Sequence, residues 1–110
     1  MTKYNIALQS RRIGDDHLIV ISGGDIPHIG AIAVAIPYNN TASLSYIDIP
    51  KHKDTLLAGP VALSAAKILK ATVVVILGIH LNNAEKDQIS EICNEVSSLV
   101  NEYCHSISDK

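Results

Sequence analysis

Three short polar segments of the chain contain histidines, and each lies next to a strongly apolar run. These segments are Ser22-Gly23-Gly24-Asp25-Ile26-Pro27-His28-Ile29-Gly30, His52-Lys53-Asp54 and Gly78-Ile79-His80-Leu81-Asn82-Asn83. Imidazoles donate or accept hydrogen bonds at neutral pH, and glycines let a backbone approach a ligand closely. Folding alone does not require three such segments in so small a chain. The sequence therefore predicts that they converge on one site for an anion or a cofactor.

The first segment combines permissive and rigid residues around His28. Gly23-Gly24 can adopt positive φ angles at little cost, and successive amides there would form an anion-binding nest, although a simple tight turn is the alternative. Asp25 adds a polar group to the same segment. Pro27 fixes the chain directly before His28, and Gly30 permits a close approach beside it. This arrangement favours a binding role for His28.

The other two segments lie at predicted junctions between elements. His52 and Lys53 precede a predicted helix, for which Asp54 would be the N-cap. His80 ends a buried strand, and the amides that begin the next helix lack partners within that helix and carry partial positive charge. A phosphate would bind there, with Asn82-Asn83 as further donors. These residues complete the predicted cofactor site.

A metal centre is an alternative use of the same histidines. His28, His52 and His80 would make an open three-histidine zinc site if their loops converge. The sequence has no H-E-x-x-H pair, no G-x-S-x-G nucleophile segment and neither of the glycine-rich phosphate-binding patterns. We therefore assign no catalytic residue and no metal ligand, and a small metal-dependent enzyme remains an alternative.

The apolar residues predict an α+β fold. Alternating or continuous branched residues predict strands, and apolar stripes at spacings of three and four predict helices. The order is four strands, a helix, a strand and a helix (ββββαβα), which suits a largely antiparallel five-stranded sheet with two helices. The predicted strands are 4–9, 17–22, 31–36, 43–49 and 72–79, and the predicted helices are 56–69 and 84–106.

Three details of these elements can be predicted from local patterns. Leu18–Ile21 and Ala31–Ile36 can pair as core strands. Alternation in the second run puts three alanines on one face, where a helix or another sheet would pack closely. The first helix either kinks at Pro60 or begins there, and Asn82 with Glu85 resembles a capping box at the start of the second helix.

The number of helices also bears on the assembly of the protein. Two helices can cover only one face of a five-stranded sheet, whereas the central strands are apolar on both faces, as in Thr72–Ile79. One apolar face is therefore left over. We expect a homo-oligomer, most simply a two-fold homodimer.

Composition and length argue against several classes of protein. The 110 residues fit a single domain, 1–110. A net charge of −2 argues against a nucleic-acid partner. The longest apolar run, Ala71–Ile79, is far shorter than the roughly 20 residues that cross a bilayer. With no signal-peptide pattern, the protein is expected to be soluble and cytoplasmic. Cys93 and Cys104 would be about 16 Å apart on a straight helix, which excludes a disulfide between them.

With these residues laid out, the chain resembles the prenylated-flavin chaperones, a family that includes the D subunit of bacterial gallate decarboxylase. The resemblance is carried, in order, by Gly24-Asp25-Ile26-Pro27-His28-Ile29-Gly30-Ala31, His52-Lys53-Asp54 and Gly78-Ile79-His80-Leu81-Asn82-Asn83-Ala84, and it spans roughly residues 4–104. The family is also similar in fold to proteasome-assembly chaperones, which are small α+β dimers.

The resemblance implies a non-catalytic accessory protein. Such a protein would bind prenylated FMN, and FMN or another phosphate-bearing ligand is also compatible. It would support delivery to, or maturation of, a UbiD-type decarboxylase. The predicted cofactor-binding residues are Gly23, Gly24, Asp25, His28, Gly30, His52, Lys53, His80, Asn82 and Asn83.

The chain has no Phe or Trp, so aromatic stacking on a flavin would depend on tyrosine. Tyr38 and Tyr46 are expected near the mouth of the site. The alternative to a cofactor-binding protein is a protein-assembly chaperone that acts through its exposed sheet face and binds no small molecule.

Overall fold

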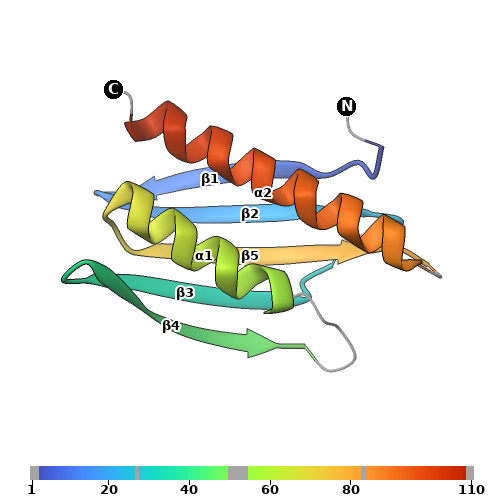
Figure 1. The fold of residues 1–110 in the computed structure, drawn as a ribbon, viewed down its shortest axis with the longest axis horizontal. Coiled ribbons are helices and arrows are strands. Elements are labelled where there is room, and N and C mark those ends of the chain that lie inside the picture. Colours follow the sequence, from blue (N-terminus) through green and yellow to red (C-terminus); the bar gives the residue numbers. More distant parts are fainter. Residues whose placement is uncertain (1–2, 27, 50–54, 83, 109–110) are drawn as a thin grey trace.

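The computed structural model describes residues 3–26, 28–49, 55–82 and 84–108 (Figure 1). The order of its elements confirms the predicted ββββαβα arrangement and the α+β class. The elements are β1 (Ala7–Ile13), β2 (Asp16–Gly24), β3 (Ala31–Tyr38), β4 (Thr41–Asp48), α1 (Thr55–Leu69), β5 (Val73–His80) and α2 (Lys86–Ser108).

The strands form one five-stranded sheet in the order β1-β2-β5-β3-β4. β5 runs parallel to β2 and antiparallel to β3, and the hairpins β1–β2 and β3–β4 are antiparallel. The sheet is therefore mostly antiparallel, as predicted. The predicted pairing of β2 with β3 is wrong, because β5 lies between them. β5 is a nearly continuous Val/Ile/Leu run, which is typical of a strand in the centre of a sheet.

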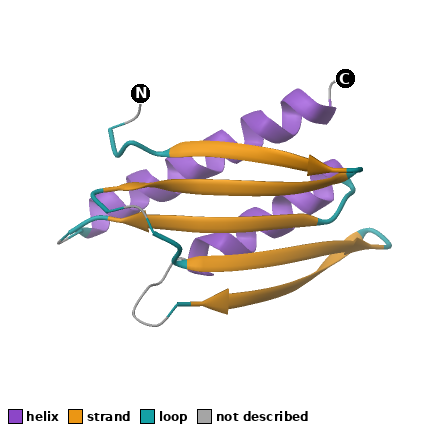
Figure 2. Ribbon diagram, turned by 180° about the vertical axis from the view of Figure 1, so that it is seen from behind, coloured by secondary structure: helices purple, strands orange, loops and turns teal. Residues whose placement is uncertain are grey.

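Both helices lie on one face of the sheet, and the other face is left open (Figures 1 and 2). Ala31, Ala33 and Ala35 are fully buried on the helix side, and α1 packs on β3, β4 and β5. The alanine face of β3 is thus covered by a helix, one of the two predicted alternatives. Small side chains on both partners allow this close contact, since α1 also contributes fully buried Ala58 and Ala62.

The two helices differ from their predictions only at their ends. α1 begins at Thr55 and continues through Pro60, so a start at the proline is wrong. Pro60 has no N–H to donate to the carbonyl four residues earlier, so α1 continues there with one hydrogen bond fewer. α2 is continuous from Lys86 to Ser108 and contains both free cysteines. Burial raises the pKa of the Cys104 thiol.

None of the helices among the described residues is long and apolar enough to cross a membrane.

His17 is a polar residue buried in the core at the start of β2, where its side chain is 4% exposed. Its Nδ1 atom lies 2.6 Å from the hydroxyl oxygen of Tyr103 on α2, and the two rings meet edge to face. Desolvation lowers the pKa of His17; the Arg12 charge lowers it further, and Asp16 opposes the shift. The neutral imidazole is therefore the form that the fold favours.

Stability is expected to fall in mild acid because of His17. In the unfolded chain His17 binds a proton near pH 6.5, whereas in the folded chain it binds a proton only at lower pH. His17 therefore adds its full share to the free energy of unfolding above pH 6.5, and this share is lost as the pH falls below that value. Urea unfolding between pH 7.5 and 5 should show this loss, and His17→Gln should flatten it. Tyr103→Phe keeps the titrating group and serves as the control. An unchanged pH profile in His17→Gln would contradict this assignment.

Candidate ligand site at the carboxyl ends of β2 and β5

The segment that follows β2 crosses the end of β5 to reach β3. Gly78 of β5 makes room for this crossing, because a Cβ atom there would lie 1.3 Å from the carbonyl oxygen of His28. The Gly30 N–H donates to the Leu77 carbonyl at 2.9 Å, and the Ile49 N–H donates to the Gly30 carbonyl at 3.0 Å. Gly30 and Gly78 thus allow the crossing segment to rest directly on the sheet.

The crossing lies on the open side of the sheet. Along β5, Val73, Val75 and Leu77 are buried beneath the helices, so Gly78 and His80 belong to the alternate, open face. The His28 and His80 rings meet there, with centroids 5.5 Å apart and planes inclined by 46°. Two of the three predicted histidines therefore converge. His52, Lys53 and Asn83 lie outside the described residues.

A polar network joins the turns that follow β2 and β5. The Asn82 N–H donates to Asp25 Oδ2 at 3.0 Å, and the Asp25 N–H donates to the His80 carbonyl at 2.7 Å. The side-chain oxygen of Asn82 lies 3.1 Å from His80 Nε2. Asp25, His80 and Asn82, which are distant in sequence, are therefore held as one unit.

Removal of the Asp25 carboxylate is expected to loosen this unit. The Asn82 amide would lose its acceptor in Asp25→Ala, at a cost of about 1 kcal/mol for a hydrogen bond of this kind. Amide hydrogen exchange at Asn82 should accelerate about five-fold. Asp25→Asn keeps an acceptor oxygen and should exchange like the wild type. Equal exchange in all three proteins would show that the bond does not order the turn.

The glycine pair at the end of β2 has structural contacts on both sides. A Cβ atom on Gly23 would lie 2.9 Å from Ile6 Cα, and one on Gly24 would lie 2.1 Å from the His80 carbonyl oxygen. Gly24 has φ +81° and donates its N–H to the Tyr4 carbonyl at 2.8 Å. The amides of Gly24 and Asp25 thus bind backbone carbonyls, and an anion at this edge would need other donors.

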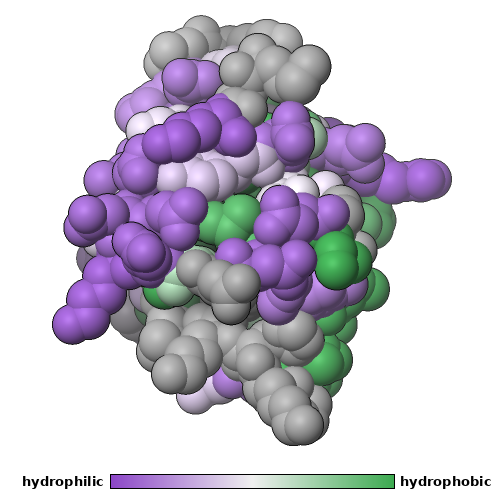
Figure 3. All heavy atoms as spheres, turned by 90° about the vertical axis from the view of Figure 1, so that its right-hand side faces the viewer, coloured by the Kyte–Doolittle hydropathy of each residue, from purple (hydrophilic) through white to green (hydrophobic). Residues whose placement is uncertain are grey.

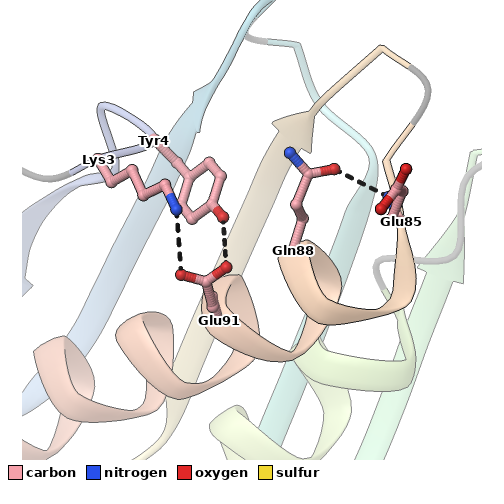
Figure 4. Close-up of polar contacts among 5 residues, drawn as sticks. All are labelled: Lys3, Tyr4, Glu85, Gln88 and Glu91. Carbon is pink, nitrogen blue, oxygen red and sulfur yellow. Dashed lines mark hydrogen bonds and ion pairs between the residues drawn. The ribbon is translucent and has the colours of Figure 1, made fainter.

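The N-terminal segment links this edge of the sheet to α2 (Figure 4). The Tyr4 hydroxyl donates to Glu91 Oε1 at 2.9 Å, and Lys3 Nζ lies 3.4 Å from Glu91 Oε2. The hydrogen bond from Tyr4 lowers the pKa of Glu91. Because Tyr4 also accepts the Gly24 amide, α2 and the end of β2 are held together through one residue.

The start of α2 differs from the predicted capping box. The Gln88 side chain accepts the Glu85 N–H at 2.9 Å, which is the return contact of a capping box placed three residues further on (Figure 4). Asn82 is instead engaged by Asp25 and His80. The predicted Asn82–Glu85 pair is therefore wrong. Glu85 also brings negative charge to the helix start, which disfavours an anion there.

Two exposed isoleucines adjoin the histidines, and sequence reasoning did not single them out. Ile26 is 55% exposed and Ile29 is 53% exposed, both in the crossing segment. Figure 3 views this end of the molecule and shows apolar groups gathered along the side away from the helices, beside a largely hydrophilic surface. Large apolar residues within an otherwise polar, glycine-rich segment are the signal that could have identified them.

Neither tyrosine lies beside the His28 and His80 rings of its own chain, as the sequence suggested it would. Tyr38 ends β3 at the other end of the sheet, where it lines a pocket of about 360 Å³ with Lys67 and Lys70. Tyr46 lies opposite Ala33 on the helix side of β4 and is 59% exposed. The prediction that Tyr38 lies near the mouth of its own chain's site is therefore wrong, because antiparallel pairing takes the end of β3 away from the ends of β2 and β5.

Within the ranges that the structure describes, no group of three His, Cys, Asp or Glu residues is placed to hold a metal ion. The three-histidine arrangement includes His52, which lies outside those ranges.

Comparison with known proteins shows the family of the chain. Residues 1–108 match the family described as the prenylated flavin chaperone LpdD-like domain. A relative, Protein LpdD of Lactiplantibacillus plantarum (strain ATCC BAA-793 / NCIMB 8826 / WCFS1), is 34% identical over 80 residues, which are 71% of this chain and 59% of the relative. The match thus spans about three-fifths of the relative's length. The chain belongs to the prenylated flavin chaperone LpdD-like family.

Proposed function

We propose that this protein is a non-catalytic accessory chaperone that binds prenylated FMN at the His28–His80 edge of its sheet. The observation that carries the proposal is the convergence of the two imidazoles, with ring centroids 5.5 Å apart, beside two exposed isoleucines. Membership of a prenylated flavin chaperone family supports the same ligand class. FMN itself is a second ligand of the same chemistry.

The residues at this edge suit the two parts of such a ligand. A flavin offers a flat apolar ring system and a phosphate. Ile26 and Ile29 offer apolar surface to the ring, and the His28 and His80 imidazoles offer hydrogen-bond donors to its polar edge or to the phosphate. Asp25 and Asn82 fix the turn that carries His80. A preordered site of this kind binds with less loss of conformational entropy.

The cofactor would then pass to a partner enzyme. We propose a UbiD-type decarboxylase in the cytoplasm as that partner, with the chaperone supporting delivery or maturation of its cofactor. The edge cluster faces solvent through Ile26 and Ile29, which suits a carrier that must release its ligand. The proposed role requires no turnover, since the histidines bind and orient the cofactor.

Calorimetric titration with FMN, and with prenylated FMN under anaerobic conditions, tests this function. The wild type should bind at least one of the two ligands, and His28→Ala/His80→Ala should weaken binding at least ten-fold. His105→Ala, on the exposed end of α2, is the matched control and should bind as the wild type does. Circular dichroism verifies that each variant is folded. Folded wild-type protein that binds neither flavin would overturn the proposal.

A further inference from the structure

Figure 2 shows the face of the sheet that the two helices leave open. Strand alternation and cross-strand register place the side chains that are not beneath the helices on this face. Ile36 is 50% exposed and Ile47 is 64% exposed there. The apolar residues of the face are Ala7, Ile13, Leu18, Val20, Ile32, Val34, Ile36, Ile47, Val74 and Ile76.

Charged groups lie only at the margins of this face, among the described residues. Arg11 belongs to the edge strand β1, and Asp16 begins β2. The centre therefore offers no charge that a partner would need to neutralise. A face of this kind fits another flat apolar face, and the same face of a second copy has that composition.

The surface area is sufficient for a stable dimer. A folded monomer of 11.8 kDa is expected to expose about 5,900 Å² of surface. This chain exposes 6872 Å², more than a monomer of its mass is expected to expose. Its extents are 41 × 29 × 22 Å. Five strands spaced by about 4.8 Å, each about 26 Å long, give roughly 600 Å² per face in projection. Two such faces bury about 1,200 Å² in total, which reaches the range of stable interfaces.

The crossing segment decides how two copies would face each other. This segment stands on the open face at Gly78, so it forms a ridge at one end of the sheet. If both ridges lay at the same end, they would meet and hold the sheets apart. A two-fold axis perpendicular to the strands places each ridge over the opposite end of the other sheet. That end carries Tyr38, which is 69% exposed. Tyr38 follows the alternation of Ile36 onto the open face and also borders the pocket beside the end of α1.

We propose that the open face packs on the same face of a second copy, with the strands running in opposite directions. In this arrangement Tyr38 of the second copy lies against the His28–His80 cluster and completes the flavin site. The shared flavin site rests on the proposed function, whereas the dimer rests on the apolar open face of the sheet. The dimer also places an aromatic ring beside the cluster.

The interface is tested first by mass. Analytical ultracentrifugation of the full chain at micromolar concentration should give a dimer. Val34→Lys should give a monomer, because it places a charge at the centre of the face. Ile36→Lys replaces a side chain that is already half exposed, so it should separate the copies even where Val34→Lys does not fold. Ser98→Lys, on the exposed side of α2, should remain a dimer. A monomeric wild type, or lysine variants that stay dimeric, would overturn the interface.

The shared site is tested by titration with prenylated FMN. Tyr38→Ala should remain a dimer but bind about ten-fold more weakly, as expected for loss of a stacked ring. Tyr46→Ala removes another exposed tyrosine from the helix side and should bind like the wild type. A dimeric Tyr38→Ala protein with unchanged affinity would overturn the shared site and leave the proposed function intact. A dimeric wild type that binds no flavin would overturn the function and the shared site, but not the interface.

Discussion

Replacement of Gly78 by alanine is expected to cost about 3 kcal/mol or more of unfolding free energy, although it adds a single methyl group. The new Cβ atom would lie 1.3 Å from the His28 carbonyl oxygen and 2.5 Å from the His28 carbonyl carbon. Both are backbone atoms, so no side chain can rotate away. The crossing segment must lift from β5, which separates the His28 ring from His80. Ligand binding should therefore be lost together with stability.

Gly14→Ala is the matched control for this substitution. Gly14 has φ +59°, but a Cβ atom there would meet nothing within 4 Å. Its cost is limited to the left-handed backbone conformation, about 1 kcal/mol. Urea unfolding of both variants provides the comparison. A Gly78→Ala protein as stable as Gly14→Ala would show that the crossing segment does not rest on β5.

Ala33→Leu should be the most damaging substitution in the layer between β3 and α1. Ala33 is fully buried, and the helix side above it is also built from small residues, including Ala62. A leucine side chain has no space there, and overpacking of this kind costs about 3 kcal/mol. The melting temperature should fall by about 15 °C.

Ser98→Leu is the control, because it adds a leucine side chain on the exposed side of α2, away from both faces of the sheet. Its effect should stay within about 0.5 kcal/mol. Differential scanning calorimetry can measure both variants. Equal melting temperatures would contradict the close packing of α1 on the alanine face.

Most of the secondary structure could be predicted from local patterns, but the strand order could not. Residues 17–22 and 31–36 are strong apolar runs near one another in sequence, so pairing between them was the natural expectation. The sheet instead places β5 between them. Periodicity describes which side chains share a face, whereas it carries no information on which strand takes the central position.

The meeting of two histidines could be predicted, although their role stays a prediction. His28 follows β2 and His80 ends β5, and these strands are neighbours in the sheet, so the two rings lie close together. Gly78 is needed because the segment after β2 passes directly over it, which is a contact between residues far apart in sequence. The local sequence around Gly78 does not reveal this contact, because a glycine in a flexible turn would look the same. Tyr38 was misplaced because its position depends on the direction in which β3 pairs.

The most direct test of the central claim is a crystal structure of the protein with prenylated FMN bound. The account predicts that the flavin contacts the His28 and His80 side chains, with Ile26 and Ile29 against its ring system. A flavin found elsewhere, such as in the pocket formed by Asn40, Lys67 and Lys70 at the other end of the sheet, would contradict it.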